Sequence, residues 1–139
     1  IMDIPWWQVL IGFFIMHYTA GMILSVVFQL AHVMPNPEMP QPDENGVMQH
    51  TWAIHQLYTT SNFAINNKFV NFWTGGLNHQ VEHHIFPHIS HIHYKKISEI
   101  VRNTAKEFNL PYNEYKTMFG ALADHFRKLD TLGKHPEIA

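Results

Sequence analysis

Residues 6–34 form an unbroken stretch of 29 residues without Lys, Arg, Asp or Glu, and this stretch constrains the fold more than any other part of the chain. Twenty-one of its residues are apolar, and the other eight are Gly, Ser, Thr, Gln and His. A membrane-spanning helix needs roughly 20 such residues, and a rise of about 1.5 Å per residue makes this stretch about 43 Å long. We therefore expect one spanning helix within residues 1–34, tilted or projecting beyond a hydrocarbon core of about 30 Å, because two half-length helices would be too short to cross.

Both ends of the stretch agree with a single span. Pro5 suits a helix start, and Trp6 and Trp7 are placed to anchor one end at the membrane interface. A secretory signal peptide is the alternative interpretation, but the stretch lacks a basic region before it and is longer than the apolar core of such peptides.

Polar and small side chains within the span follow one face of the expected helix and predict contact with protein, not lipid. They are His17, Gly21, Ser25 and Gln29, which recur at every fourth position, followed by His32. An ionisable residue such as His32, at the end of a span, indicates a functional site.

The chain changes character after the span. Residues 35–47 contain four prolines and predict an exposed loop. In residues 48–73, aromatic residues among Asn and Lys predict an interfacial helix along the membrane surface, with a buried face in a soluble protein as the alternative. All nine basic residues lie at or beyond Lys68, so the positive-inside bias places the part after the span on the cytoplasmic side.

Residues 95–139 carry two apolar stripes with helical spacing, which predict two amphipathic helices packed against a core. The stripes are Ile97, Ile100, Val101, Ala105 and Phe108 in the first, and Tyr115, Met118, Phe119, Leu122, Phe126 and Leu129 in the second. Asn113 is expected to cap the second helix. The predicted fold class is therefore all-α: an integral membrane helical fragment with one long transmembrane helix and a cytosolic helical cap, in which residues 48–94 hold the interfacial helix and a histidine-rich region.

Histidine is concentrated in that region, since six of the chain's 12 histidines lie within residues 79–93. Imidazoles suit zinc, iron or copper, and a pH switch is the other function typical of clustered histidines. The chain has no Cys, which excludes disulfides, iron–sulfur clusters and thiolate zinc sites. A formal net charge of -2 also argues against a nucleic-acid partner.

If the segment before Pro87 is helical, Gln80, His83 and His84 share one face and can converge on a metal. Glu82 points elsewhere, where it either hydrogen-bonds an imidazole or is solvated. His79 and His83 have the spacing of a zinc peptidase helix, but the glutamate is not beside the first histidine, so only a generic zinc site with a distant His stays open. No phosphate-binding loop, G-x-S-x-G elbow or kinase signature occurs.

The segment Gln80-Val81-Glu82-His83-His84, followed by Ile85-Phe86-Pro87, resembles the third histidine box, Q-x-x-H-H, of the membrane fatty acid desaturases. Gln in the first position is typical of the front-end branch, which inserts a double bond between an existing one and the carboxyl end. Residues 73–78 and 55–63 also resemble this family, particularly its bacterial acyl-CoA members. The resemblance covers nearly the whole chain, as the carboxy-terminal third of the family's length.

This resemblance implies a four-span membrane enzyme whose cytosolic cap carries two irons. Its iron ligands here would be His32, His83 and His84, with Gln80 in the first box position either binding iron or orienting a ligand. The animal stearoyl-CoA desaturases have a water-mediated Asn ligand four residues before the equivalent of His32, and Phe28 stands in that place here. His55 would reach the site only through another side chain.

The implied reaction is O2-dependent insertion of a cis double bond into a fatty acyl chain, linked to CoA or to a lipid. Electrons would come from cytochrome b5 or a ferredoxin, and the location would be a membrane such as the bacterial inner membrane. The family's first two boxes, H-x-x-x-H and H-x-x-H-H, are absent from their expected place before the third, so residues 1–139 alone are expected to be inactive. The alternatives are a lipid hydroxylase on the same di-iron scaffold and a membrane-anchored, histidine-rich zinc-binding module without catalysis.

Overall fold

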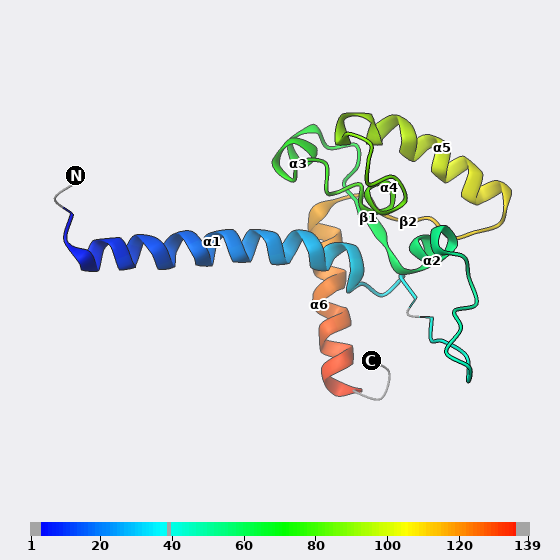
Figure 1. Ribbon diagram of the computed structural model, residues 1–139, viewed down its shortest axis with the longest axis horizontal. Coiled ribbons are helices and arrows are strands. Elements are labelled where there is room, and N and C mark those ends of the chain that lie inside the picture. The colour runs from blue at the N-terminus through cyan, green and yellow to red at the C-terminus, as the bar shows by residue number, and fades with distance from the viewer. Residues whose placement is uncertain (1–3, 39, 136–139) are drawn as a thin grey trace.

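One long helix projects from a cap of shorter elements in the computed structural model, which describes residues 4–38 and 40–135 (Figure 1). In chain order the elements are α1 (Trp6–His32), α2 (Trp52–Thr59), β1 (Ser61–Phe63), α3 (Lys68–Trp73), α4 (Gln80–Ile85), the 3-10 turn η1 (His91–His93), α5 (Tyr94–Glu107), β2 (Asn113–Tyr115) and α6 (Met118–Lys134).

The long helix α1 confirms the single helix expected from the uncharged stretch. It begins directly after Pro5 and ends at His32, two residues before the stretch does. Within the described residues it is the one helix with the length and apolar composition to cross a membrane, and its most apolar 18-residue window has no buried residue. A helix of this composition in the core of a soluble protein would be covered by other elements.

Residues 48–73, in which an interfacial helix is expected, do not form one continuous helix. The segment contains α2, β1 and α3 as three separate elements. Thr60 turns the backbone to extended geometry after α2, and the Ser61 hydroxyl donates to the Leu30 and Ala31 carbonyls at the end of α1, both at 3.2 Å. The carbonyls at a helix end have no partner within the helix, so Ser61 satisfies two of them and fixes β1 against α1.

The all-α expectation also needs correction, because β1 and β2 form a two-stranded parallel sheet. Ser61 pairs with Asn113, Asn62 with Glu114 and Phe63 with Tyr115. The helical majority of the prediction holds, since the remaining elements are helices.

The two amphipathic helices exist as α5 and α6, with a later start for the second. Asn113 and Tyr115 belong to β2, and α6 is capped instead by Thr117, whose hydroxyl accepts a hydrogen bond from the Gly120 N–H at 3.0 Å. The predicted burial of the stripes is only partly correct. Val101, Ala105 and Tyr115 are buried, whereas five stripe residues are exposed: Ile100, Phe108, Phe119, Phe126 and Leu129.

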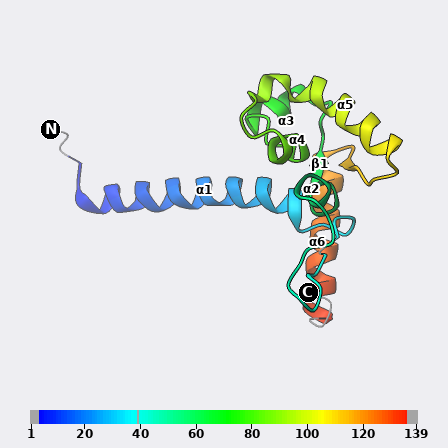
Figure 2. The ribbon, with the colours of Figure 1, turned by 45° about the vertical axis from the view of Figure 1, so that its right-hand side comes forward.

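Two apolar clusters hold the cap together, one on each side of α4. The first joins the end of α1 to the sheet, α3 and α6 through Val27, Leu30, Met34, Phe63, Ala64, Val70, Tyr115 and Ala121. The second joins α2, α4 and α5 through Leu57, Val81, Val101 and Ala105. The turned view separates α3, α4 and α5 from α6, which extends on the other side of α1 (Figure 2).

Candidate metal centre

The short helix α4 carries three of the four residues expected to bind metal. Gln80, His83 and His84 lie at i, i+3 and i+4 within Gln80–Ile85, so the predicted helix is confirmed and their side chains leave neighbouring positions of one face. Gly75 and Gly76, at φ +60° and +82°, turn the chain into this segment after α3. These left-handed backbone angles favour glycine.

The fourth residue, His32, reaches α4 from the end of α1. Its ring centroid lies 5.0 Å from that of His84, and the His83 and His84 rings are 5.9 Å apart. Burial, followed by the nearby charges of His32 and His83, lowers the pKa of His84 to about 4. His84 is therefore a neutral imidazole at neutral pH, the form that can bind a metal.

Two side chains from other helices fix the orientation of these rings. The Nδ1–H of His84 donates to Oε1 of Gln56 on α2 at 2.6 Å, and Nδ1 of His83 lies 3.2 Å from the hydroxyl oxygen of Tyr94 on α5. Metal-binding histidines commonly use one nitrogen for such a contact and the other for the metal. This leaves Nε2 of both rings as the nitrogen that could bind a metal.

Gln56 and Tyr94 were missed in the sequence, where His55 was expected to reach the site instead. His55 Nδ1 is buried without a hydrogen-bond partner. The only signal for Gln56 was its place beside His55 in the segment that resembles the desaturases, and Tyr94 had none.

Gln80 and His79 bury polar atoms that have no hydrogen bond. Both residues are fully buried, and neither the Gln80 amide atoms nor the two His79 ring nitrogens has a hydrogen-bond partner. His79 Nδ1 lies 3.8 Å from Oε2 of Glu82, which is too far for a hydrogen bond. Since buried polar groups are normally paired, these atoms are available to a bound ligand.

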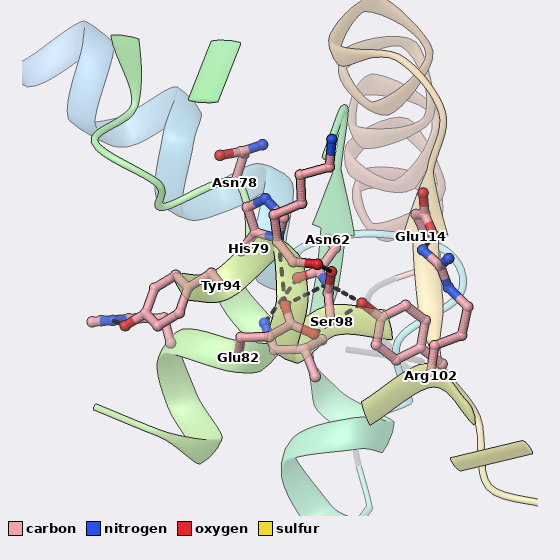
Figure 3. Close-up of polar contacts among 12 residues, drawn as sticks. Asn62, Asn78, His79, Glu82, Tyr94, Ser98, Arg102 and Glu114 are labelled. Carbon is pink, nitrogen blue, oxygen red and sulfur yellow. Dashed lines mark hydrogen bonds and ion pairs between the residues drawn. The ribbon is translucent and has the colours of Figure 1, made fainter. Parts of the chain in front are cut away.

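Glu82 is fully buried in a polar network and is not solvated (Figure 3). Its Oε2 accepts from Asn62 Nδ2 at 2.8 Å and its Oε1 from the Tyr112 hydroxyl at 2.9 Å, while Asn62 Oδ1 accepts from the Val81 N–H at 2.9 Å. Burial, and then the negative charge of Glu82, raise the pKa of Tyr112 well above its ordinary value. Arg102 lies over the Tyr112 ring and pairs with Glu114. The network ties α4 to β1 and to the segment before β2.

Most other histidines lie away from this group. His88, His91 and His93 are exposed after α4, and His50 stacks on Tyr58. His125 is buried, and its Nδ1–H donates to the Val33 carbonyl at 2.8 Å. Among residues 4–38 and 40–135, no three His, Cys, Asp or Glu side chains come close enough together to hold a metal ion by themselves.

The residues present nevertheless fit part of an iron centre by their chemistry. His32, His83 and His84 offer imidazole nitrogens, which suit iron, and the buried Gln80 amide beside them has no other partner. The ring contacts bring the three imidazoles together from two elements.

Comparison with known proteins agrees with this chemistry. The family model for fatty acid desaturase matches residues 2–116. The chain is 44% identical to an sn-1 linoleoyl-lipid 6-desaturase of Synechocystis sp. over 91% of its length and 36% of that protein's. It is also 44% identical to an sn-1 linoleoyl-lipid 6-desaturase of Arthrospira platensis (94% and 35%), and 42% identical to an acyl-lipid (8-3)-desaturase of Physcomitrium patens (81% and 23%).

The chain therefore spans about a third of the length of the first two relatives. No solved structure matches it. The match of the family model over most of the chain confirms the resemblance seen in the histidine box, and the chain belongs to the fatty acid desaturase family.

Proposed function

We propose that residues 1–139 are the carboxy-terminal part of a front-end fatty acid desaturase and provide one side of its iron centre. One observation carries this proposal. His32 at the end of α1 and His84 on α4, which are far apart in the sequence, bring their rings to 5.0 Å.

In this centre His32, His83 and His84 hold iron, the two α4 histidines through Nε2, and the Gln80 amide either binds iron or orients a ligand. When bound, two irons supply the O2-dependent removal of hydrogen from unactivated methylene groups, which side-chain acids and bases cannot achieve. The protein's own contribution is positioning: Gln56 and Tyr94 set the imidazole rings, and the buried Glu82 network fixes α4 beneath them.

The proposed substrate is a fatty acyl chain linked to a lipid, in keeping with the names of the relatives. Electrons come from cytochrome b5 or a ferredoxin. We further propose that α1 spans a membrane, because its most apolar window of 18 residues contains no buried residue, and that the cap lies on the cytoplasmic side, because every basic residue follows α1.

The test uses the full-length desaturase that contains these residues, produced in a host that lacks its product. Gas chromatography of the host's fatty acids should show a new double bond between an existing one and the carboxyl end. His83→Ala and His84→Ala should each abolish that product and lower the iron content of the purified protein. His88→Ala, which removes an exposed histidine just after α4, is the matched control and should retain both.

Normal product from His83→Ala or His84→Ala would refute the assignment. A hydroxylated lipid in place of the unsaturated one would identify a hydroxylase on the same scaffold. One tightly held zinc, without oxygen consumption, would identify a metal-binding module.

A further inference from the structure

The exposure of α1 changes along its length. Residues 6–22 are all exposed, and burial begins after them, with Val27, Leu30 and Ala31 almost completely covered. The helix has 27 residues, which makes it about 40 Å long against about 30 Å for the hydrocarbon core of a bilayer. The excess length therefore lies at the covered end, within the cap.

Two helices cover this end of α1. Trp73 of α3 and Met118 of α6 line an apolar hollow together with Met22, Ile23, Val26 and Val27 of α1. A second hollow lies between Phe126 of α6 and the stretch of α1 that includes Ser25 and Gln29. Both helices thus meet α1 at the level of Met22 to Gln29.

The same two helices expose large apolar side chains. On α3 these are Phe69, Phe72 and Trp73, which are 72%, 86% and 52% exposed; on α6 they are Phe119, Phe126 and Leu129, at 85%, 60% and 41%. Three exposed residues on a six-residue helix are too many for a surface that faces only water, where large apolar patches are rare.

The orientation of α6 suits a membrane surface. It runs crosswise to α1 in both views (Figures 1 and 2), so a bilayer that α1 crosses would lie along α6. His125 and Phe126 both line the hollow beside Ser25 and Gln29, and the Nδ1–H of His125 donates to Val33 near the far end of α1, which leaves Phe126 on the side of α6 nearer the N-terminus of α1. The exposed rings of α6 therefore lie on its membrane side, and charged residues such as Asp124 and Lys128 occupy the opposite face.

The length of the exposed part of α1 agrees with this position. Trp6 to Ser25 comprises 20 residues, or about 30 Å of helix, which matches the hydrocarbon core. Trp6 and Trp7 lie at one end of that length, and the aromatic residues of α3 and α6 lie at the other, as in the aromatic belts of membrane proteins.

We propose that α3 and α6 rest on the bilayer at the level of Met22 to Ser25, with their exposed aromatic side chains at the boundary between phospholipid headgroups and acyl chains. This inference rests on the proposed span of α1 and not on the metal centre. The interfacial position then belongs to two helices: α3, which lies within residues 48–73, and α6, which follows β2. His32, seven residues beyond Ser25, then lies about 10 Å outside the hydrocarbon core.

Spin labelling of the full-length desaturase in phosphatidylcholine vesicles tests the proposal. Residues 1–139 contain no Cys, so once any Cys elsewhere in the full-length protein is replaced by Ser, single labels can be introduced at Phe72 and Phe126, with Phe69 and Phe119 as a second pair. Power saturation then compares collisions with dissolved O2, which concentrates in lipid, and with a water-soluble nickel complex. Ile15→Cys reports on the span, and Arg127→Cys, beside Phe126 and largely exposed, is the matched aqueous control.

We expect labels at Phe72 and Phe126 to have a higher ratio of O2 to nickel collisions than the label at Arg127, and a lower ratio than the label at Ile15. Nickel accessibility equal to that of Arg127 would overturn the proposal. Protection from both reagents would also overturn it, since the rings would then be covered by protein. If the label at Ile15 is itself accessible to nickel, the proposed span of α1 is also wrong. The label at Ile15 therefore distinguishes failure of the span from failure of the interfacial position alone.

Discussion

Gln56 contacts the proposed metal centre through a single hydrogen bond. Its Oε1 accepts from the Nδ1–H of His84 at 2.6 Å and so turns Nε2 of that ring towards the proposed iron. Loss of such a partner typically lowers metal affinity by about 10–100-fold. We predict that Gln56→Leu weakens iron binding by a factor in that range, measured by titration of the metal-free full-length protein with ferrous iron.

Two variants separate positioning from general disruption. Gln56→Glu keeps an acceptor at the same place and should restore most of the affinity. Gln49→Leu makes the same chemical change at an exposed site and should leave the affinity unchanged. Equal affinities for the Leu variants of Gln56 and Gln49 would refute the positioning role.

Tyr112 supports the buried carboxylate of Glu82. Its hydroxyl donates at 2.9 Å to Oε1, while Asn62 serves the other oxygen. Tyr112→Phe leaves one oxygen of a buried carboxylate without its donor, which costs about 1–3 kcal/mol. We predict a loss of that size in the free energy of unfolding, measured by denaturant titration of the full-length protein in detergent.

Tyr18→Phe is the control, because that side chain is 81% exposed on α1; it should leave the free energy of unfolding unchanged. A Tyr112→Phe variant as stable as Tyr18→Phe would show that water replaces the lost donor.

The turn between α3 and α4 depends on two glycines with different surroundings. A Cβ on Gly76 would lie 2.6 Å from the Cβ of His91, whereas a Cβ on Gly75 would meet nothing within 4 Å. Both positions have positive φ, and a left-handed conformation costs a residue with a Cβ about 1–2 kcal/mol.

We predict that Gly75→Ala lowers the free energy of unfolding only by the cost of the left-handed conformation. Gly76→Ala should lower it further, because the segment around His91 must also move. The difference should appear as a lower thermal unfolding midpoint for Gly76→Ala than for Gly75→Ala. Equal midpoints would mean that the segment around His91 yields without cost.

At the scale of elements, the sequence pattern correctly predicted those helices whose formation depends on neighbouring residues in the chain. The uncharged stretch predicted α1, and the spacing of Gln80, His83 and His84 predicted α4. The sheet was missed because β1 pairs with residues about fifty positions further along the chain, and no periodicity within residues 48–73 reports that partner. Likewise, no local pattern around His125 reports its hydrogen bond to Val33, which joins α6 to the end of α1.

In the candidate site too, the residues that are close in the sequence were predicted and those that come from distant elements were not. The histidine box identified Gln80, His83 and His84 because all three lie within one helical turn and a half. Gln56, Tyr94 and the partners of Glu82 come from α2, α5, β1 and the segment before β2. Their roles depend on how the two apolar clusters pack these elements around α4, which spacing along the chain does not report.

For the molecule as a whole, the number of metal donors is the decisive quantity. Three imidazoles meet at the junction of α1 and α4, the Gln80 amide lies on the same short helix, and no three His, Cys, Asp or Glu residues in the described part of the chain are close enough to hold a metal without further help. Two irons need more nitrogen donors than this, and the first two histidine boxes of the family do not precede the third within these 139 residues. We predict that residues 1–139, purified alone in detergent, bind fewer than two irons per chain and form no double bond in an acyl-lipid supplied with O2 and a reduced ferredoxin. The full-length desaturase under the same conditions is the control, and two irons with unsaturated product from residues 1–139 alone would contradict the proposed division of the metal centre.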